Sequence, residues 1–137
     1  MSPAGVPPFP LWLQSYVYAT ASVTIVSGAV AERTSPVGYM GHALLTCGLT
    51  YPVVVHWVWS RDGWLSTVNP DAFLGGMVDF AGGGVVHMLG GCISLVGTII
   101  VGPRTGRFND QTGRPVAMPG QSSVFMALGT FFLWVGW

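Results

Sequence analysis

Four long stretches without a charged residue constrain this chain more than any other feature of its sequence. They are residues 11–31, 34–60, 80–103 and 115–137. Each is long enough to supply the roughly 20 apolar residues that a helix needs to cross the hydrocarbon core of a bilayer. A soluble protein with buried helices is the alternative, but it needs polar faces at helical spacing, and these stretches are apolar nearly all round. The sequence therefore predicts an all-α integral membrane protein.

The charge content points the same way. Only 7% of the 137 residues are charged, whereas a soluble domain usually carries about a quarter. The first ten residues hold four prolines and no basic residue, so they are interpreted as an extended lead-in and not as a secretory signal peptide. We expect helices at about 11–33, 37–59, 79–101 and 122–137. An outer loop is expected at 60–78 and a cytoplasmic loop at 102–121.

Arginine placement predicts the orientation in the membrane, because positive residues stay preferentially on the cytoplasmic side. Arg33 follows the first expected helix, and three further arginines follow the third. The loop at 60–78 holds one arginine against two aspartates. We therefore expect that loop on the outside, where Trp57, Trp59 and Trp64 favour the membrane boundary. The loops after the first and third helices are expected on the cytoplasmic side.

The third expected helix carries a stripe of small and polar residues. At spacings of three or four these are Asp79, Gly83, His87, Gly90, Gly91, Ser94 and Thr98. The opposite side, suited to lipid or apolar packing, is Phe80, Val85, Met88, Leu95 and Ile99. Asp79 suits an N-cap, and the glycines suit close helix packing.

His87 lies about eight residues into that helix, roughly 12 Å below its outer end at 1.5 Å per residue. An ionisable side chain at that depth usually faces a cavity, a pathway or a partner. A neutral histidine that only bonds a neighbouring helix is the alternative. For His42 and His56 we expect structural roles, since neither lies on such a stripe.

The sequence contains no motif typical of a soluble enzyme or of a nucleic-acid-binding protein. Cys47 and Cys92 are isolated and predict neither a disulfide nor a metal site. There is no phosphate-binding loop, no nucleophile elbow and no basic patch for nucleic acid. We expect no enzyme activity, no cofactor, no metal and no nucleic-acid partner.

Four motifs carry a more specific signal. They read "TIVSGAVAERT" at 24–34, "YPVVVHWVWSRDGWL" at 51–65, "VDFAGGGVVHMLGG" at 78–91 and "LGTFFLWVGW" at 128–137. In this order they resemble the ammonium transporter family, the Amt/Mep/Rh group, over nearly everything after Leu11. The resemblance implies an eleven-helix fold built from two inverted halves of five helices each, with one pore per subunit of a homotrimer. This chain is similar to its third to fifth transmembrane helices and the start of the sixth, a partial bundle of about four helices over residues 1–137.

The resemblance also implies roles for individual residues. His87 matches the first of two pore histidines, and its partner is not in this chain. Asp79 matches a buried aspartate that shapes the outer recruitment site through hydrogen bonds. Trp59 matches the aromatic wall of that site, and Tyr18 the position of a gating phenylalanine.

Two further positions are expected near the pathway. Tyr51 lies where the family often has an aromatic residue, and Gln14 stands where many members carry an outer gating phenylalanine. The implied function is transport of ammonium or ammonia across the cell membrane by a full-length parent of which this chain is a fragment. Two alternatives stay open: a related sensor that does not transport ammonium, and a short regulatory or assembly partner of full-length transporters.

Overall fold

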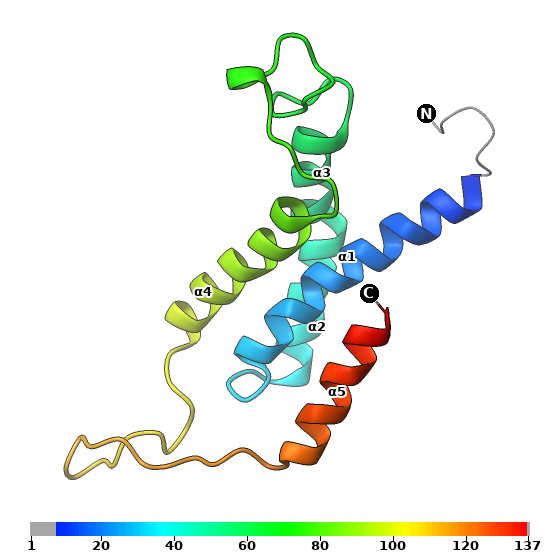
Figure 1. Cartoon of the computed structure of the whole chain (residues 1–137). Coiled ribbons are helices and arrows are strands. Elements are labelled where there is room, and N and C mark those ends of the chain that lie inside the picture. Colours follow the sequence, from blue (N-terminus) through cyan, green and yellow to red (C-terminus); the bar gives the residue numbers. More distant parts are fainter. Residues whose placement is uncertain (1–7, 137) are drawn as a thin grey trace. The chain divides into compact units, whose positions relative to one another are not determined.

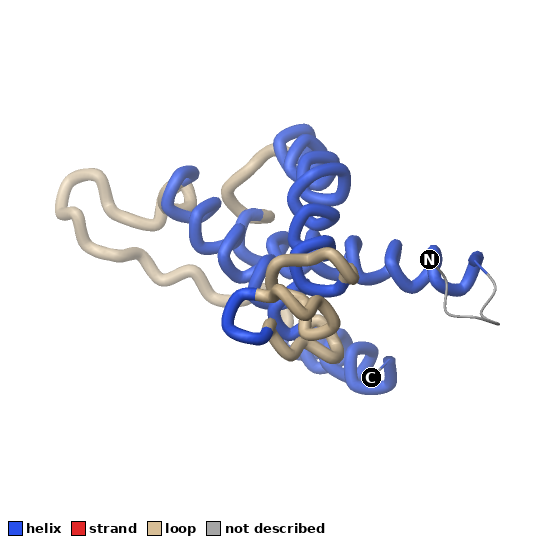
Figure 2. The backbone as a smooth tube through the Cα atoms, turned by 90° about the horizontal axis from the view of Figure 1, so that it is seen from above, coloured by secondary structure: helices blue, strands red, loops and turns tan. Residues whose placement is uncertain are grey.

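Residues 8–136 are described by the computed structural model, and all their extended regular elements are helices (Figures 1 and 2). The predicted all-α class is therefore confirmed. The chain divides into two compact units, Met1–Pro103 and Arg104–Trp137, which are treated separately below. In chain order the elements are α1 (Pro8–Val30), α2 (Pro36–Leu45), the π-helical η1 (Thr46–Thr50), α3 (Tyr51–Trp59), the 3₁₀ turn η2 (Phe73–Gly75), the π-helical η3 (Gly83–Met88), α4 (Leu89–Val101) and α5 (Ser123–Gly136).

Helix α1 begins at Pro8 and ends at Val30, where the sequence predicted about 11–33. Pro8 can begin the helix because N–H groups in the first turn have no carbonyl partner within the helix, so the N–H that proline lacks is not missed there. At the other end the N–H groups of Arg33 and Thr34 both donate to the Val30 carbonyl and close a turn. The extended lead-in predicted for residues 1–10 is thus wrong at residues 8–10, and its remainder lies outside the described residues.

The second predicted helix, at 37–59, is a continuous helical run of three segments, α2, η1 and α3. Pro52 explains the interruption, since it has no N–H to donate and its ring clashes with the carbonyl four residues earlier. The chain accommodates this residue by widening to π geometry at Thr46–Thr50 just ahead of it. At the start, Ser35 caps α2 by accepting a hydrogen bond from the Gly38 N–H at 3.2 Å.

The connection after α3 folds back onto the end of that helix. The Leu65 N–H donates to the Trp57 carbonyl at 3.0 Å, and the Met77 N–H donates to the Leu65 carbonyl at 2.7 Å. Gly63 allows the return, because a Cβ there would lie 2.4 Å from the carbonyl oxygens of His56 and Trp57. The far end of the connection, residues 76–82, is thereby held beside α3.

The third predicted helix, at 79–101, begins four residues later, at Gly83. Residues 79–82 are not helical, and the residue at the N-cap position is Gly82, with a φ of 87°. The prediction of Asp79 as the N-cap residue is therefore wrong. Its carboxylate nevertheless binds the first N–H groups of the helix from its position ahead of it, as described below.

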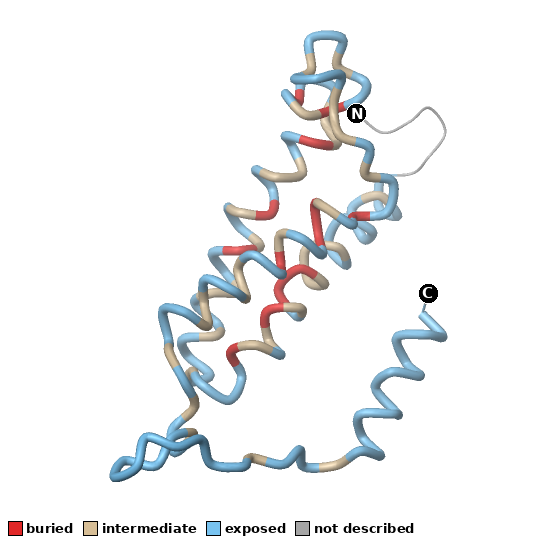
Figure 3. The backbone as a smooth tube through the Cα atoms, turned by 60° about the vertical axis from the view of Figure 1, so that its left-hand side comes forward, coloured by how far each residue is buried: buried red, intermediate tan, exposed pale blue. Residues whose placement is uncertain are grey.

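Helices α1 and α4 pack closely at Gly90. A Cβ on Gly90 would lie 2.9 Å from Ile25 Cβ and 3.0 Å from the Ser22 carbonyl oxygen. At the cytoplasmic ends expected from the arginines, the Arg33 guanidinium donates to the Gly102 carbonyl at 2.9 Å. Buried residues lie in α1, α3, η3 and α4 (Figure 3). The fully or nearly fully buried apolar residues are Val23, Val26, Val30, Tyr51, Val58, Val85 and Val86.

One described helical stretch, Gly83–Val101, is long and apolar enough to cross a membrane by length and composition alone. Helix α1 has 23 residues but carries many hydroxyl side chains, which make it less apolar. Several of these hydroxyls, including those of Ser15 and Ser22, donate to carbonyls three or four residues earlier. They therefore bring no unpaired donor into an apolar phase.

The second unit holds α5 and the chain that leads to it. In the segment that precedes α5, the Asn109 side chain accepts hydrogen bonds from the N–H groups of Gln111 and Thr112. Phe108 forms an isolated β-bridge with Pro115. Helix α5 begins at Ser123, close to the predicted 122, and is exposed along its described length (Figure 3).

Candidate functional site

A hollow of about 320 Å³ lies where α1, the end of α3 and the segment ahead of η3 meet. Its lining residues are Gln14, Tyr18, Trp59, Asp79 and Phe80. Four of these five are among the six site residues that the sequence analysis singled out. Three segments far apart in the sequence thus bring most of the predicted pathway residues to one place.

The Asp79 carboxylate organises the backbone at this site. One oxygen, Oδ1, accepts from the Gly82 N–H at 2.7 Å. The other, Oδ2, accepts from the N–H groups of Gly84 at 2.9 Å and Val85 at 2.7 Å. Free N–H groups at a helix start attract a negative charge. The carboxylate therefore fixes the non-helical segment 79–82 against the start of η3.

The charge of Asp79 is stabilised by the same contacts. Asp79 lies ahead of the apolar stretch Gly83–Val101, and burial alone would raise the pKa of its carboxyl. Hydrogen bonds from the backbone N–H groups of Val85, Gly82, Gly84 and Gly83 outweigh this burial and hold the pKa below the usual value of 3.8. Asp79 is therefore ionised at neutral pH and places a fixed negative charge at the hollow.

Trp59 is held by the backbone of Asp79. Its indole Nε1 donates to the Asp79 carbonyl oxygen at 2.7 Å, which fixes the ring at the last residue of α3. The Tyr18 ring lies beside it, with ring centroids 5.8 Å apart and planes at 48°. Two aromatic rings from different helices thus form adjoining walls of the hollow.

Gln14 and Tyr18 lie one turn apart on α1 and are linked. The Gln14 Nε2 donates to the Tyr18 hydroxyl at 3.4 Å, a long hydrogen bond. Through this pair two polar groups line the hollow at positions where the family resemblance leads one to expect phenylalanines. The site accordingly combines aromatic faces with an amide and a hydroxyl.

His87 and Tyr51 do not line this hollow. His87 lies within η3 with its side chain exposed, and its backbone N–H donates to the Gly82 carbonyl at 3.0 Å. Tyr51 is 5% exposed and belongs to the buried cluster with Val58, Val85 and Val86. Tyr18 and Trp59 pack against that cluster, so Tyr51 belongs to the core beneath these two rings and not to the lining of the hollow.

Phe80 lines the hollow, although the sequence analysis placed it on the side suited to lipid or apolar packing. The helical projection fails there because residues 79–82 are not helical. A usable signal was present, since an aspartate with three glycines beginning three residues later favours a loop that a carboxylate can cap.

The predicted stripe is also altered by the π geometry of η3. Among its glycines, Gly90 is buried against α1, whereas Gly83 and Gly91 face open space in this chain. On the opposite side, Val85 is fully buried in the core, while Met88, Leu95 and Ile99 are exposed as expected for a lipid-facing surface. Only part of the stripe therefore serves helix packing.

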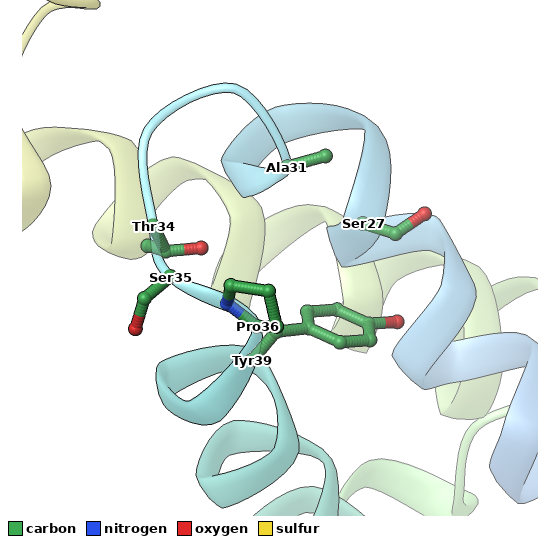
Figure 4. A pocket seen from close by; sticks show the side chains of 6 residues that line it. All are labelled: Ser27, Ala31, Thr34, Ser35, Pro36 and Tyr39. Atoms are coloured by element: carbon green, nitrogen blue, oxygen red, sulfur yellow. The ribbon is translucent and has the colours of Figure 1, made fainter.

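Four other hollows among residues 8–136 are lined by none of the predicted site residues. One of about 260 Å³ lies at the turn between α1 and α2, where the Tyr39 side chain reaches toward α1 beneath Pro36 (Figure 4). Within residues 8–136 no three His, Cys, Asp or Glu side chains gather closely enough to hold a metal ion.

Comparison with known proteins identifies relatives along almost the whole chain. The pattern of the Ammonium Transporter Family matches residues 2–137. The chain is 48% identical over 132 residues to "Ammonium transporter 1 member 1" of Oryza sativa subsp. japonica, which covers 94% of this chain and 26% of the rice protein. The chain is also 48% identical over 127 residues to "Ammonium transporter 1 member 1" of Solanum lycopersicum, covering 92% of this chain and 26% of that protein.

A third relative is "Ammonium transporter 1 member 4" of Arabidopsis thaliana, 47% identical over 131 residues, with 94% of this chain and 26% of that protein covered. This chain thus spans about a quarter of the length of these relatives. No solved structure matches it significantly. The match over residues 2–137 shows that the chain belongs to the ammonium transporter family, an all-α family of membrane proteins.

Proposed function

We propose that this chain provides the outer recruitment site and part of the pathway of a protein that carries ammonium across the cell membrane. The observation that carries the proposal is the hollow itself, where Tyr18, Trp59 and Asp79 meet. Family membership supports ammonium as the substrate. The proposed activity belongs to a full-length transporter that contains this chain, with several membrane spans per subunit and three subunits.

Cation recognition follows from the chemistry of the lining. The faces of tryptophan and tyrosine rings attract a cation, by about 2 kcal/mol or more where water is excluded. The ionised Asp79 adds a favourable field without touching the ion, because its two oxygens already accept three backbone N–H groups. Aromatic faces together with the Gln14 and Tyr18 oxygens can replace part of the hydration shell of ammonium.

His87 provides the next step of the proposal. It follows the hollow along the chain, inside the apolar stretch Gly83–Val101. A bare cation is very costly in such surroundings, so ammonium crosses more easily after giving up a proton. A neutral imidazole can accept a hydrogen bond or relay that proton. Potassium has no proton to give, and the same apolar section rejects it.

The test compares two tryptophans of α3 in a full-length transporter that contains this chain. Trp59 lines the hollow, whereas Trp57 contacts Trp64 on the outer loop, with ring centroids 5.8 Å apart. Trp59→Leu is expected to raise the KM for ammonium on the order of tenfold, because one cation–π face is lost. Trp57→Leu leaves the KM unchanged.

Uptake is measured in cells that lack their own ammonium transporters, at matched amounts of protein in the membrane. Equal KM values for the two variants would refute the recruitment site. Absence of saturable ammonium uptake by the unchanged full-length protein would refute the transport function itself.

A further inference from the structure

Part of the wall of the hollow at Trp59 is an amide and not an aromatic ring. Gln14 lines the hollow together with the rings of Tyr18, Trp59 and Phe80 and with Asp79. The oxygens of the Asp79 carboxylate already accept three backbone N–H groups. Neutral hydrogen-bond acceptors for a cation in the hollow therefore come from Gln14 and from the Tyr18 hydroxyl.

The Gln14 amide is oriented by the residue one turn further along α1. Its Nε2 donates to the Tyr18 hydroxyl at 3.4 Å, and the Tyr18 ring lies beside the Trp59 ring, with centroids 5.8 Å apart. Since the amide is planar, a contact at Nε2 also limits where the carbonyl oxygen Oε1 can lie.

The Gln14 Oε1 is available to a ligand. Within residues 8–136 it accepts no hydrogen bond from a side chain or from the backbone. Gln14 is exposed and lines the hollow, so a small molecule there can reach this oxygen. An amide oxygen is acceptor-only and carries two lone pairs, which suits a ligand that brings N–H groups.

An amide oxygen and an aromatic face favour different cations. A ring face attracts positive charge and also binds methylated ammonium groups, which is how aromatic cages recognise quaternary amines. A carbonyl oxygen binds an ammonium group through an N–H, and hydrogen bonds to a charged group are stronger than those between neutral groups. Each methyl group on the nitrogen removes one N–H, and a site built for N–H groups rejects analogues that lack them.

We propose that Gln14 is a specificity-determining residue, whose Oε1 accepts an N–H from the cation in the hollow and so favours ammonium over methylated ammonium ions. The inference rests on the proposed recruitment function of the hollow and deepens it, because it names the feature of the cation that is recognised. The phenylalanine that the family resemblance leads one to expect at position 14 would add a ring face and remove this preference.

Two substitutions separate the oxygen from the ring in a full-length transporter that contains this chain. Gln14→Met keeps the side-chain length and removes the amide, whereas Gln14→Phe introduces an aromatic face. Gln111→Met is the matched control, because Gln111 is exposed and does not line the hollow. Ammonium uptake is measured in cells without their own ammonium transporters, with tetramethylammonium, which has no N–H, as a competitive inhibitor.

The two constants are expected to change separately. Gln14→Met raises the KM for ammonium about tenfold, because a hydrogen bond to a charged group is lost. It leaves the inhibition constant of tetramethylammonium within about twofold of the wild-type value, since that ion has no hydrogen bond to lose. Gln14→Phe lowers the inhibition constant roughly tenfold through the added ring face. Gln111→Met changes neither constant.

Three results would overturn the inference. They are an unchanged KM in Gln14→Met, a rise of both constants by the same factor in that variant, and no inhibition by tetramethylammonium in either the wild type or Gln14→Phe. Trp59→Leu is measured alongside. A raised KM in Trp59→Leu with unchanged constants in Gln14→Met refutes the role of Gln14 alone, whereas an unchanged KM in Trp59→Leu refutes the recruitment site itself.

A further measurement separates direct contact from an effect through Tyr18. Tyr18→Phe removes the hydroxyl to which Gln14 donates and keeps a ring beside Trp59. If Oε1 contacts the cation, Gln14→Met still raises the KM for ammonium in the Tyr18→Phe background. If Gln14 only held the Tyr18 hydroxyl, Gln14→Met would change nothing further in that background, and the proposed contact would be wrong.

Discussion

Asp79 affects the hollow through the backbone, and its carboxylate does not need to contact a substrate. Its two oxygens accept N–H groups from Gly82, Gly84 and Val85, while its own carbonyl accepts the Trp59 indole N–H. One residue therefore joins the start of η3 to the aromatic wall. A substitution of this carboxylate is expected to shift the backbone of residues 79–82 and with it the position of the Trp59 ring.

Asp79→Asn replaces one acceptor oxygen by an NH₂ group that faces backbone donors. We expect it to destabilise a full-length protein that contains this chain by about 2 kcal/mol, because buried N–H groups lose a charged acceptor, and to raise the KM for ammonium as Trp59 shifts. Thermal unfolding and uptake measure the two effects. Asp71→Asn serves as the control, since Asp71 is an exposed residue of the outer loop. An unaltered melting temperature for Asp79→Asn would contradict this role.

The stability difference between wild type and Asp79→Asn also depends on pH. The folded state holds the Asp79 pKa below its ordinary value of 3.8, so folding favours the ionised form. This contribution is fully present above the unfolded value and is lost as the pH falls through the folded pKa. The difference in melting temperature is therefore expected to be constant near neutral pH and to shrink below about pH 4. A difference that grew toward acid would show the opposite sign and refute this assignment.

The motifs of the sequence singled out several residues whose roles in a pathway stay predictions, although the structure brings three of them together. Tyr18, Trp59 and Asp79 line one hollow as expected from the motifs. Phe80 was missed because its place depends on the non-helical path of residues 79–82, and no helical projection contains that path.

At the scale of elements, the two π-helical segments lie next to residues of the proposed pathway. The segment η1 directly precedes Tyr51, and η3 contains His87. One extra residue in a turn rotates the following side chains by about 100°, which places them on a different face from an ideal helix. Single-turn π segments are frequent at functional sites. The sequence predicted the existence of both helices, but not these segments. Pro52 marks an interruption without fixing which turn widens, and the stretch Gly83–Val101 contains no proline to mark one.

The close packing of α1 and α4 depends on one glycine of the predicted stripe. Gly90→Ala would place a Cβ 2.9 Å from Ile25 Cβ and 3.0 Å from the Ser22 carbonyl oxygen. We expect the overpacking to destabilise the chain by about 1–3 kcal/mol. The neighbouring Gly91 has nothing within 4 Å of its added Cβ, so Gly91→Ala is expected to be neutral or stabilising by up to about 1 kcal/mol.

Both variants are compared by thermal unfolding of the 137-residue chain in detergent micelles. Since the two glycines are adjacent, the substitutions change helix propensity and composition equally and differ only in what the new methyl group meets. Equal melting temperatures for Gly90→Ala and Gly91→Ala would show that α1 and α4 do not pack as described.

At the scale of the whole molecule, the first unit is an open arrangement with large apolar surfaces. Phe80 is 98% exposed although it lines the hollow, and the His87 side chain is exposed too. Exposed apolar surface on this scale is typical of surfaces that meet lipid or further protein. Because the chain spans 26% of the length of its relatives, we propose that the rest of a full-length transporter covers the pathway side.

The isolated chain is therefore expected to show no transport of its own. Transporters built from inverted repeats place their substrate path at the interface between the repeats, and one partial repeat leaves that path open on one side. The 137-residue chain, expressed in cells without ammonium transporters, should give only the background uptake of untransformed cells. A full-length transporter that contains the chain is the positive control, and membrane insertion of both proteins is checked by fractionation. Saturable ammonium uptake by the inserted chain would mean that copies of it close a pathway together, and the proposed division of the path between two repeats would then be wrong.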